Sequence, residues 1–246
     1  MNAKLSKRLI VAGGKKIRFL YGGHGPPLIF IHGLPTSPEC YSKSLAILSS
    51  RFTIYAPYIF KLNCATTKEI ANALFGMMKA LNLNRVTVVG TSFGGIIASH
   101  LSIIAGKTVS SLVLVNTAGV PREASAARSA ANFFKSITAM LLHGQVDVVL
   151  NRVFAALGFC TSLWQEGPRD LLKEVGQKVH LCYLFNNIAV KTTIIWSKSD
   201  EMFPPSCAKV LAKFIKKSRL VTVEGTHAWV FHKPEEFAET ILAAAK

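Results

Sequence analysis

Acidic residues are scarce in this sequence, and so are charged residues in general. The 246 residues include 13 Asp and Glu against 29 Lys and Arg, a formal net charge of +16, yet only 17% of the residues are charged. A positive balance can attract nucleic acid, anionic lipid or acidic substrates. The cations are scattered, however, and the densest group, Lys213, Lys216, Lys217 and Arg219, indicates the solvated face and end of a helix. We expect no specific nucleic-acid partner.

The sequence also lacks a long, wholly apolar run. The longest stretch without Asp, Glu, Lys or Arg covers residues 86–106, which is long enough to span a bilayer. It is interrupted by Thr, Ser, His and Gly, and its first part is β-branched, so it favours a buried strand followed by a buried helix. The apolar residues 9–12, after basic Lys4, Lys7 and Arg8, are too few for the core of a signal peptide. We expect a soluble cytoplasmic protein, monomeric or homodimeric, with contact to a membrane surface as the less favoured alternative.

Paired cysteine motifs are missing as well. The five cysteines, Cys40, Cys64, Cys160, Cys182 and Cys207, are widely spaced and none forms a CxxC pair. This pattern gives no support to a metal or redox site, and free, buried thiols are the favoured interpretation. A single disulfide is left open. We expect no metal and no cofactor.

The pattern that is present is an alternation of short apolar segments and longer amphipathic ones, without repeats or a linker. It indicates one α/β domain with a mostly parallel, doubly wound sheet covered on both faces. The expected strands lie at residues 16–21, 28–31, 52–56, 86–89, 111–115, 192–196 and 220–223. The expected helices lie at residues 66–81, 94–105, 206–215 and 234–245.

Residues 121–190 break this alternation, because helical patterns continue there without a convincing strand. The segment is rich in aromatic residues and Leu, among them Phe134, Phe154 and Trp164. A helical insertion between two strands is the simplest account. It predicts either an apolar cap over a site, which Trp164 would line, or ordinary packing of helices on the sheet.

Polar residues follow several of the expected strands. They are His32, Ser92, Asp200 and His227, and the last three form a serine, an acid and a histidine in chain order. Active groups of open parallel sheets gather at the carboxyl ends of strands. Ser92 lies in a G-x-S-x-G sequence between a strand and a helix, where a tight turn lifts the hydroxyl to the helix N-terminus. We expect the flanking glycines to have no room for a side chain.

Each candidate has a competitor. Ser92 could cap the following helix, but a cap does not require glycines on both sides. His232 competes with His227, and the adjacent Glu201 competes with Asp200. His24 and His100 are expected to have no chemical role.

At these motifs the chain resembles the α/β-hydrolase superfamily over nearly its whole length. "FIHGLP" is similar to the oxyanion loop, "VVGTSFGG" to the nucleophile elbow, "IIWSKSDEMFPP" to the acid turn and "VEGTHAWVFHKPEEF" to the histidine loop. The resemblance implies an α/β-hydrolase core at residues 1–120 and 191–246, and a helical cap at 121–190 inserted after the sixth strand. It also implies catalysis without a cofactor.

The resemblance assigns roles to individual residues. Ser92 would be the nucleophile, His227 the general base and acid, and Asp200 the carboxylate that orients the imidazole. The backbone N–H groups of Leu34 and Phe93 would form the oxyanion hole. His32 would shape the oxyanion loop through hydrogen bonds, and His32, Met202, Phe203 and Trp164 are the candidate substrate contacts.

The sequence departs from the superfamily in places that do not remove a catalytic group. Thr91 stands where a histidine is often found, Ser197 where a glycine is common, and the loop "PYIFKLNCATT" replaces an acidic, Gly-containing one. We expect a hydrolase of carboxylic esters with small to medium acyl groups. The alternatives are a C–C bond hydrolase of β-diketone-like acids, a perhydrolase or thioesterase, a slow-turnover receptor for a small molecule, and a lipase acting at membrane surfaces.

Overall fold

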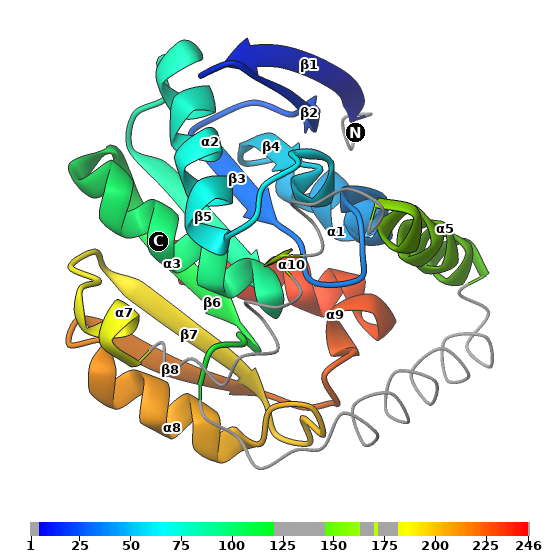
Figure 1. Ribbon diagram of the computed structural model, residues 1–246. Helices are drawn as coiled ribbons and strands as arrows, with labels where there is room; N and C mark the ends of the chain where they lie inside the picture. The colour runs from blue at the N-terminus through cyan, green and yellow to red at the C-terminus, as the bar shows by residue number, and fades with distance from the viewer. Residues whose placement is uncertain (1–4, 121–145, 163–169, 172–181, 246) are drawn as a thin grey trace.

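A computed structural model describes residues 5–120, 146–162, 170–171 and 182–245 (Figure 1). The described residues form one eight-stranded sheet with helices around it. The strands are β1 (Ser6–Ala12), β2 (Lys15–Gly22), β3 (Pro27–Ile31), β4 (Thr53–Pro57), β5 (Val86–Thr91), β6 (Val109–Val115), β7 (Thr192–Ser197) and β8 (Ser218–Val223). The α-helices are α1 (Ser42–Leu48), α2 (Thr67–Ala80), α3 (Phe93–Ala105), α5 (Val146–Ser162), α7 (Cys182–Asn186), α8 (Pro205–Phe214), α9 (Trp229–His232) and α10 (Pro234–Ala244). Short 3-10 turns are η1 (Pro38–Tyr41), η2 (Ile59–Lys61) and η3 (Gly106–Thr108).

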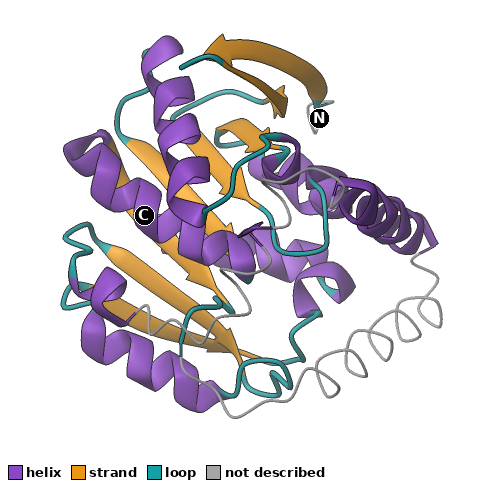
Figure 2. Cartoon of the chain, viewed as in Figure 1, coloured by secondary structure: helices purple, strands orange, loops and turns teal. Residues whose placement is uncertain are grey.

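The sheet has the order β1-β2-β4-β3-β5-β6-β7-β8. All pairs from β4 to β8 are parallel, whereas β1 with β2 and β2 with β4 are antiparallel. Helices cover both faces (Figure 2). Since every expected strand is present, the predicted doubly wound, mostly parallel sheet is confirmed.

Alternate residues of the central strands divide between two layers of core. In β5 and β6, Val88 and Leu114 pack with α2 and α3 on one face, and Val89 and Val115 pack with α1 and α10 on the other. All four side chains are fully buried. Two-sided burial explains why these strands are continuous apolar runs rather than alternating ones.

Two elements near the N-terminus were not predicted, namely β1 and α1. Two of the residues of β1, Leu9 and Val11, are exposed, so this edge strand lacks the buried pattern of the central ones. Its pairing with β2 depends on the turn at Gly13 and Gly14, whose φ values are +57° and +75°. A turn with two positive φ angles favours glycine, and it joins the strands as a hairpin.

The expectation that Lys213, Lys216, Lys217 and Arg219 form the face and end of one helix holds for Lys213, in the last turn of α8, and is wrong for Arg219. Helix α8 ends at Phe214, and Arg219 lies on β8. The Arg219 guanidinium donates hydrogen bonds to Thr193 Oγ1 (3.1 Å) and to the Ala243 carbonyl (2.9 Å). This arginine therefore joins the edge of the sheet to the last helix instead of capping α8.

The described part of the insertion is helical and lies between β6, the sixth strand, and β7. Helix α5 packs against η1 and η2 through its buried residues Val149 and Arg152. Most of the residues 121–190 assigned to the cap, including Trp164, lie outside the described residues. Among the described helices, none is long and apolar enough to cross a membrane.

Candidate active site

Ser92 lies between β5 and α3 in a strained backbone conformation, with φ 50° and ψ −121°. This region is sterically unfavourable for any residue with a side chain. Three hydrogen bonds hold it: the Ser92 N–H donates to the Val115 carbonyl (2.9 Å), and the Ser92 carbonyl accepts from the N–H groups of Gly95 and Ala118 (3.0 Å each). The serine side chain therefore leaves the end of β5 in a fixed direction.

The glycines on either side of Ser92 are required by close packing. A Cβ atom on Gly90 would lie 2.6 Å from the Gly94 carbonyl oxygen, and one on Gly94 would lie 2.2 Å from the carbonyl oxygen of Ile31. Both distances are below any normal contact. The expectation that these positions have no room for a side chain is confirmed.

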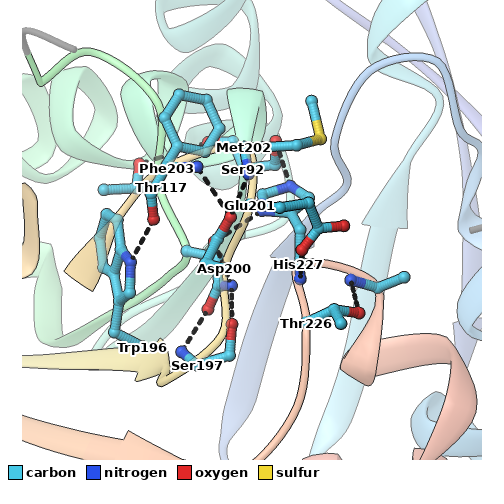
Figure 3. Close-up of polar contacts among 12 residues, drawn as sticks. Ser92, Thr117, Trp196, Ser197, Asp200, Glu201, Met202, Phe203, Thr226 and His227 are labelled. Atoms are coloured by element: carbon cyan, nitrogen blue, oxygen red, sulfur yellow. Dashed lines mark hydrogen bonds and ion pairs between the residues drawn. The ribbon is translucent and has the colours of Figure 1, made fainter. Parts of the chain in front are cut away.

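Three side chains from three strand ends form one hydrogen-bonded chain (Figure 3). His227 Nε2 lies 3.2 Å from Ser92 Oγ, and His227 Nδ1 lies 2.8 Å from Asp200 Oδ2. Since an ionised carboxylate can only accept, we assign the proton to Nδ1, which leaves Nε2 as an acceptor for the serine hydroxyl. This arrangement can remove a proton from Ser92.

Asp200 is held by the turn that follows β7. Its side chain is fully buried, and Oδ1 accepts hydrogen bonds from the N–H groups of Met202 (2.8 Å) and Phe203 (2.7 Å). The Trp196 indole N–H donates to the Phe203 carbonyl (2.9 Å) and fixes the same turn from the core. Backbone donors of this kind satisfy a buried carboxylate, which would otherwise be costly.

The structure decides between the competing candidates. The Glu201 carboxylate accepts from the backbone N–H of His227 (3.1 Å), so Asp200 is the acid that binds the imidazole. His227, and not His232, is the histidine that reaches Ser92. His232 is the last residue of α9, five positions further along the chain.

Phe203 and Met202 lie close to Asp200, where the sequence placed them, and their described contacts are with the protein. The Phe203 ring is buried and lies 5.4 Å from the ring of His227. Both residues contribute backbone N–H groups to Asp200. Their predicted role in binding a substrate stays a prediction.

The loop after β3 passes directly beside the serine. A Cβ atom on Gly33 would lie 3.1 Å from Ser92 Cβ and 3.7 Å from Ser92 Oγ. The Gly33 carbonyl accepts hydrogen bonds from Thr36 Oγ1 (2.7 Å) and Thr36 N (3.2 Å), and lies 3.0 Å from His32 Nδ1. Because the N–H of Leu34 belongs to the same planar peptide and points the opposite way, these donors also fix its direction.

His32 is a positioning residue of this loop. Its side chain is 1% exposed, and its Nε2 accepts from the Ile59 N–H (3.4 Å), so Nδ1 carries the proton that the Gly33 carbonyl accepts. Burial lowers the pKa of His32 to about 4, which keeps the imidazole neutral. The prediction that His32 shapes the oxyanion loop agrees with these contacts. Its second predicted role, as a substrate contact, stays a prediction; the ring is buried and both of its nitrogens have partners within the protein.

Sequence reasoning missed two residues of the site. Asn116 follows β6, is buried, and donates from Nδ2 to Asp200 Oδ2 (2.5 Å). Phe60 in η2 stacks on Phe93 with ring centroids 5.8 Å apart and lies 5.4 Å from the ring of His32. Asn116 could have been found, because it is a polar residue at the carboxyl end of a strand. Phe60 lies in the loop "PYIFKLNCATT", which departs from the superfamily, and the sequence predicted no role for it.

The described cysteine side chains are free thiols. The expected free, buried thiols are found at Cys40, Cys64 and Cys207, whereas Cys160 is free but exposed. In the described part of the chain, no three His, Cys, Asp or Glu side chains are grouped so that they could hold a metal ion.

The chain belongs to the alpha/beta hydrolase family, whose model matches residues 28–240. An uncharacterised protein of Mycobacterium tuberculosis is 26% identical over 93% of this chain and 77% of its own. The 2-hydroxy-6-oxo-6-(2'-aminophenyl)hexa-2,4-dienoic acid hydrolase of Metapseudomonas resinovorans is 22% identical over 96% of this chain and 90% of its own.

Solved structures agree with this family. A serine hydrolase involved in carbazole degradation superimposes with a TM-score of 0.78, at 22% identity and over 98% of each chain. An esterase of Thermogutta terrifontis superimposes with a TM-score of 0.76, at 18% identity and over 97% of each chain. At these identities the likeness concerns the fold, and the family's general activity is that of a hydrolase.

Proposed function

We propose that this protein is a serine hydrolase that cleaves carboxylic esters with small to medium acyl groups through an acyl-enzyme on Ser92. The observation that carries the proposal is the unbroken chain from Ser92 Oγ through the His227 imidazole to the buried Asp200. The roles are a nucleophile, a general base and acid, and an orienting carboxylate.

The first step is attack of Ser92 on the ester carbonyl. His227 Nε2, 3.2 Å from the hydroxyl, accepts the proton as the new C–O bond forms. Asp200 holds the imidazole with Nε2 directed at the serine and stabilises the positive charge that develops on the ring. The low exposure of both side chains, 14% for His227 and 0% for Asp200, strengthens this interaction because little water screens it.

The negative charge that develops on the ester carbonyl oxygen needs hydrogen-bond donors close to Ser92. The Phe93 N–H is the first of helix α3, whose N-terminal end favours negative charge. The Leu34 N–H is the second donor, and the hydrogen bonds to the Gly33 carbonyl fix its direction. Removing one such donor typically costs about 10²–10³ in rate.

The second half of the reaction returns the enzyme to its starting state. His227 gives its proton to the leaving alcohol oxygen, and the alcohol departs. The same imidazole then removes a proton from water, which attacks the acyl-enzyme, and the acid is released as Ser92 regains its proton. The ester and one water molecule are consumed, and the nucleophile, the base and the hydrogen-bond donors of each step come from the chain.

The preference for esters is supported by a structural neighbour that is an esterase. A second candidate, hydrolysis of a C–C bond in a β-diketone-like acid, is favoured by one observation. The Metapseudomonas resinovorans hydrolase, which is named for such a dienoic acid, aligns with nearly the whole of both chains. The net charge of +16 would favour an acidic substrate in this case.

The test is hydrolysis of p-nitrophenyl acetate, butyrate, octanoate and palmitate by the wild type, by Ser92→Ala and by Ser50→Ala. Ser50 is exposed and distant from the catalytic groups in sequence, so it is the matched control. We expect turnover of the shorter esters by the wild type and the control, and none above background for Ser92→Ala.

The dienoic acid named for the Metapseudomonas relative is assayed in parallel. A faster Ser92-dependent reaction with this acid than with any ester would replace the ester proposal with the C–C hydrolase. If ester turnover survives in Ser92→Ala, the proposed nucleophile is wrong.

A further inference from the structure

Asn116 contacts the catalytic carboxylate from a strand that contributes none of the three main groups. It lies one residue beyond β6, and the residue as a whole is 2% exposed. Its Nδ2 donates to Asp200 Oδ2 at 2.5 Å and to Ser197 Oγ at 2.6 Å. The oxygen that it binds on Asp200 is the one that accepts the hydrogen bond from His227.

The orientation of this amide follows from its partners. The backbone N–H of Ser197 can only donate, and the Asn116 atom that faces it at 3.2 Å is therefore the amide oxygen. The amide nitrogen then faces Asp200 and has both hydrogens in use. The Asn116 amide thus both accepts from and donates to Ser197, and its second N–H donates to Asp200.

The backbone of Asn116 also requires a special residue. Its φ is +43°, in the left-handed region, where asparagine, aspartate and glycine are the residues best tolerated. Its N–H donates to the Ile195 carbonyl of β7 (3.0 Å), which fixes the position from which the side chain extends. Main chain and side chain therefore join the end of β6 to β7 and to the acid turn.

We propose that Asn116 is a positioning residue of the reaction, which acts through Asp200 on the orientation of the His227 imidazole. It supplies the only side-chain donor other than His227 that the described contacts give to Asp200, since Oδ1 is bound by backbone N–H groups. Without it, Oδ2 keeps only the hydrogen bond with His227, and the carboxylate is held by the backbone N–H groups at Oδ1 alone. Ser197, which stands where the superfamily commonly has glycine, provides the amide with its other partners. This role rests on the proposed function.

The effect of a substitution at Asn116 depends on the charged and titratable groups around Asp200. His227 binds it directly, and Glu201 binds the His227 backbone N–H from the other side. Asn116→Asp would keep the size and the tolerance for positive φ but would place a second carboxylate against Asp200. The new carboxylate could not donate to Asp200, so the hydrogen bond to Oδ2 would be lost and the two negative charges would repel each other.

The experiment compares the wild type with Asn116→Gly, Asn116→Asp and the control Asn82→Asp. Gly tolerates the positive φ, so it removes the side chain without backbone strain. Asn82 has a φ of +52° but is exposed after α2, so its substitution repeats the same chemical change away from the site. We expect a fall in kcat of about 10- to 100-fold for Asn116→Gly, with KM within twofold of the wild type, because a hydrogen bond to a charged group is lost.

Two readouts separate this role from a structural one and from failure of the proposed function. The first is the rate at which a fluorophosphonate labels Ser92, which needs no knowledge of the substrate. The second is the low-field proton resonance of the His227 Nδ1–H, assigned by its loss in His227→Gln. We expect slower labelling and a displaced resonance in both Asn116 variants, and no change in Asn82→Asp.

The proposal is overturned if Asn116→Gly keeps kcat, labelling rate and resonance, or if its loss of activity only follows a loss of folded protein. If the wild type labels at Ser92 but hydrolyses no ester, the substrate class is wrong, and the labelling rates and the resonance still test Asn116.

Discussion

The Nε2 atom of His227 lies 3.2 Å from Ser92 Oγ, although 135 residues separate the two in the chain. The parallel sheet explains this proximity, because β5, β7 and β8 all end at the same edge and each is followed by one of the catalytic groups. The geometry is thus a property of the topology, and the turns after the strands only refine it. Three predictions follow from the contacts that hold these turns.

Asp200→Asn should lower kcat by about 10⁴-fold, because an amide in place of the carboxylate favours the wrong tautomer of His227. Glu201→Gln is the matched control, since its carboxylate accepts from the backbone N–H of His227 and lies next to Asp200 in the same turn. We expect this control to lose no more than about 10-fold, in keeping with the loss of one hydrogen bond. Steady-state kinetics on one soluble ester measures both variants. A severe loss in Glu201→Gln with near-full activity in Asp200→Asn would reverse the assignment of the acid.

Gly94→Ala should destabilise the protein by about 3 kcal/mol or more, since its Cβ would overlap the carbonyl oxygens of Ile31 and His32 at 2.2 and 2.5 Å. These atoms are backbone and belong to the strand that leads into the oxyanion loop. Gly76→Ala is the control, because it lies inside α2 and its Cβ would meet Ala12 Cβ at an ordinary 3.8 Å.

The control should gain about 0.5–1 kcal/mol, because alanine is the better residue within a helix. Urea unfolding of the two variants beside the wild type measures both changes in the free energy of unfolding. Equal stability of Gly94→Ala and Gly76→Ala would show that the close approach of β3 to the elbow is not as described.

Stability should fall as the pH is lowered from about 6.5 to 4. Burial lowers the pKa of His32 from 6.5 to about 4, so in this interval the unfolded chain binds a proton that the folded protein does not. The loss of folding stability that is due to His32 reaches about 3 kcal/mol near pH 4 and vanishes above the pKa of the unfolded chain. Burial lowers the pKa of His100 to about 4 as well, and the nearby Lys68 adds to the shift.

His32→Gln removes one of these two titrations. Urea unfolding between pH 4.5 and 7.5 should therefore give a shallower pH dependence for the variant than for the wild type, with the two slopes converging above pH 7. Identical slopes in the acidic range would mean that His32 is protonated in the folded protein.

The sheet and the three principal groups could be predicted from sequence because both depend on local patterns. Buried parallel strands are continuous apolar runs, and the elbow at Ser92 requires glycines that stand out from their surroundings. The hairpin strand β1 could not be predicted in this way. Its residues Leu9 and Val11 are exposed, and it is held to β2 by backbone pairing and not by a buried apolar face.

The contacts that refine the site were harder to predict. Asn116 has the local signal of a polar residue after a strand, but its contact with Asp200, 84 residues later, is not encoded in any local pattern. The choice between Asp200 and Glu201 was difficult for the same reason. Adjacent acids in a turn differ in the direction of their side chains, which the sequence does not give. His32 was assigned two roles from the sequence, and the described contacts agree with the first of them, the shaping of the loop after β3.

The central claim is that Ser92 becomes acylated, and rapid-quench mass spectrometry with p-nitrophenyl butyrate tests it most directly. The account predicts a butyryl group on the peptide that contains Ser92, formed within the first turnover and absent from Ser92→Ala. Hydrolysis of the ester without any adduct on this peptide, or an adduct on a different residue, would contradict it.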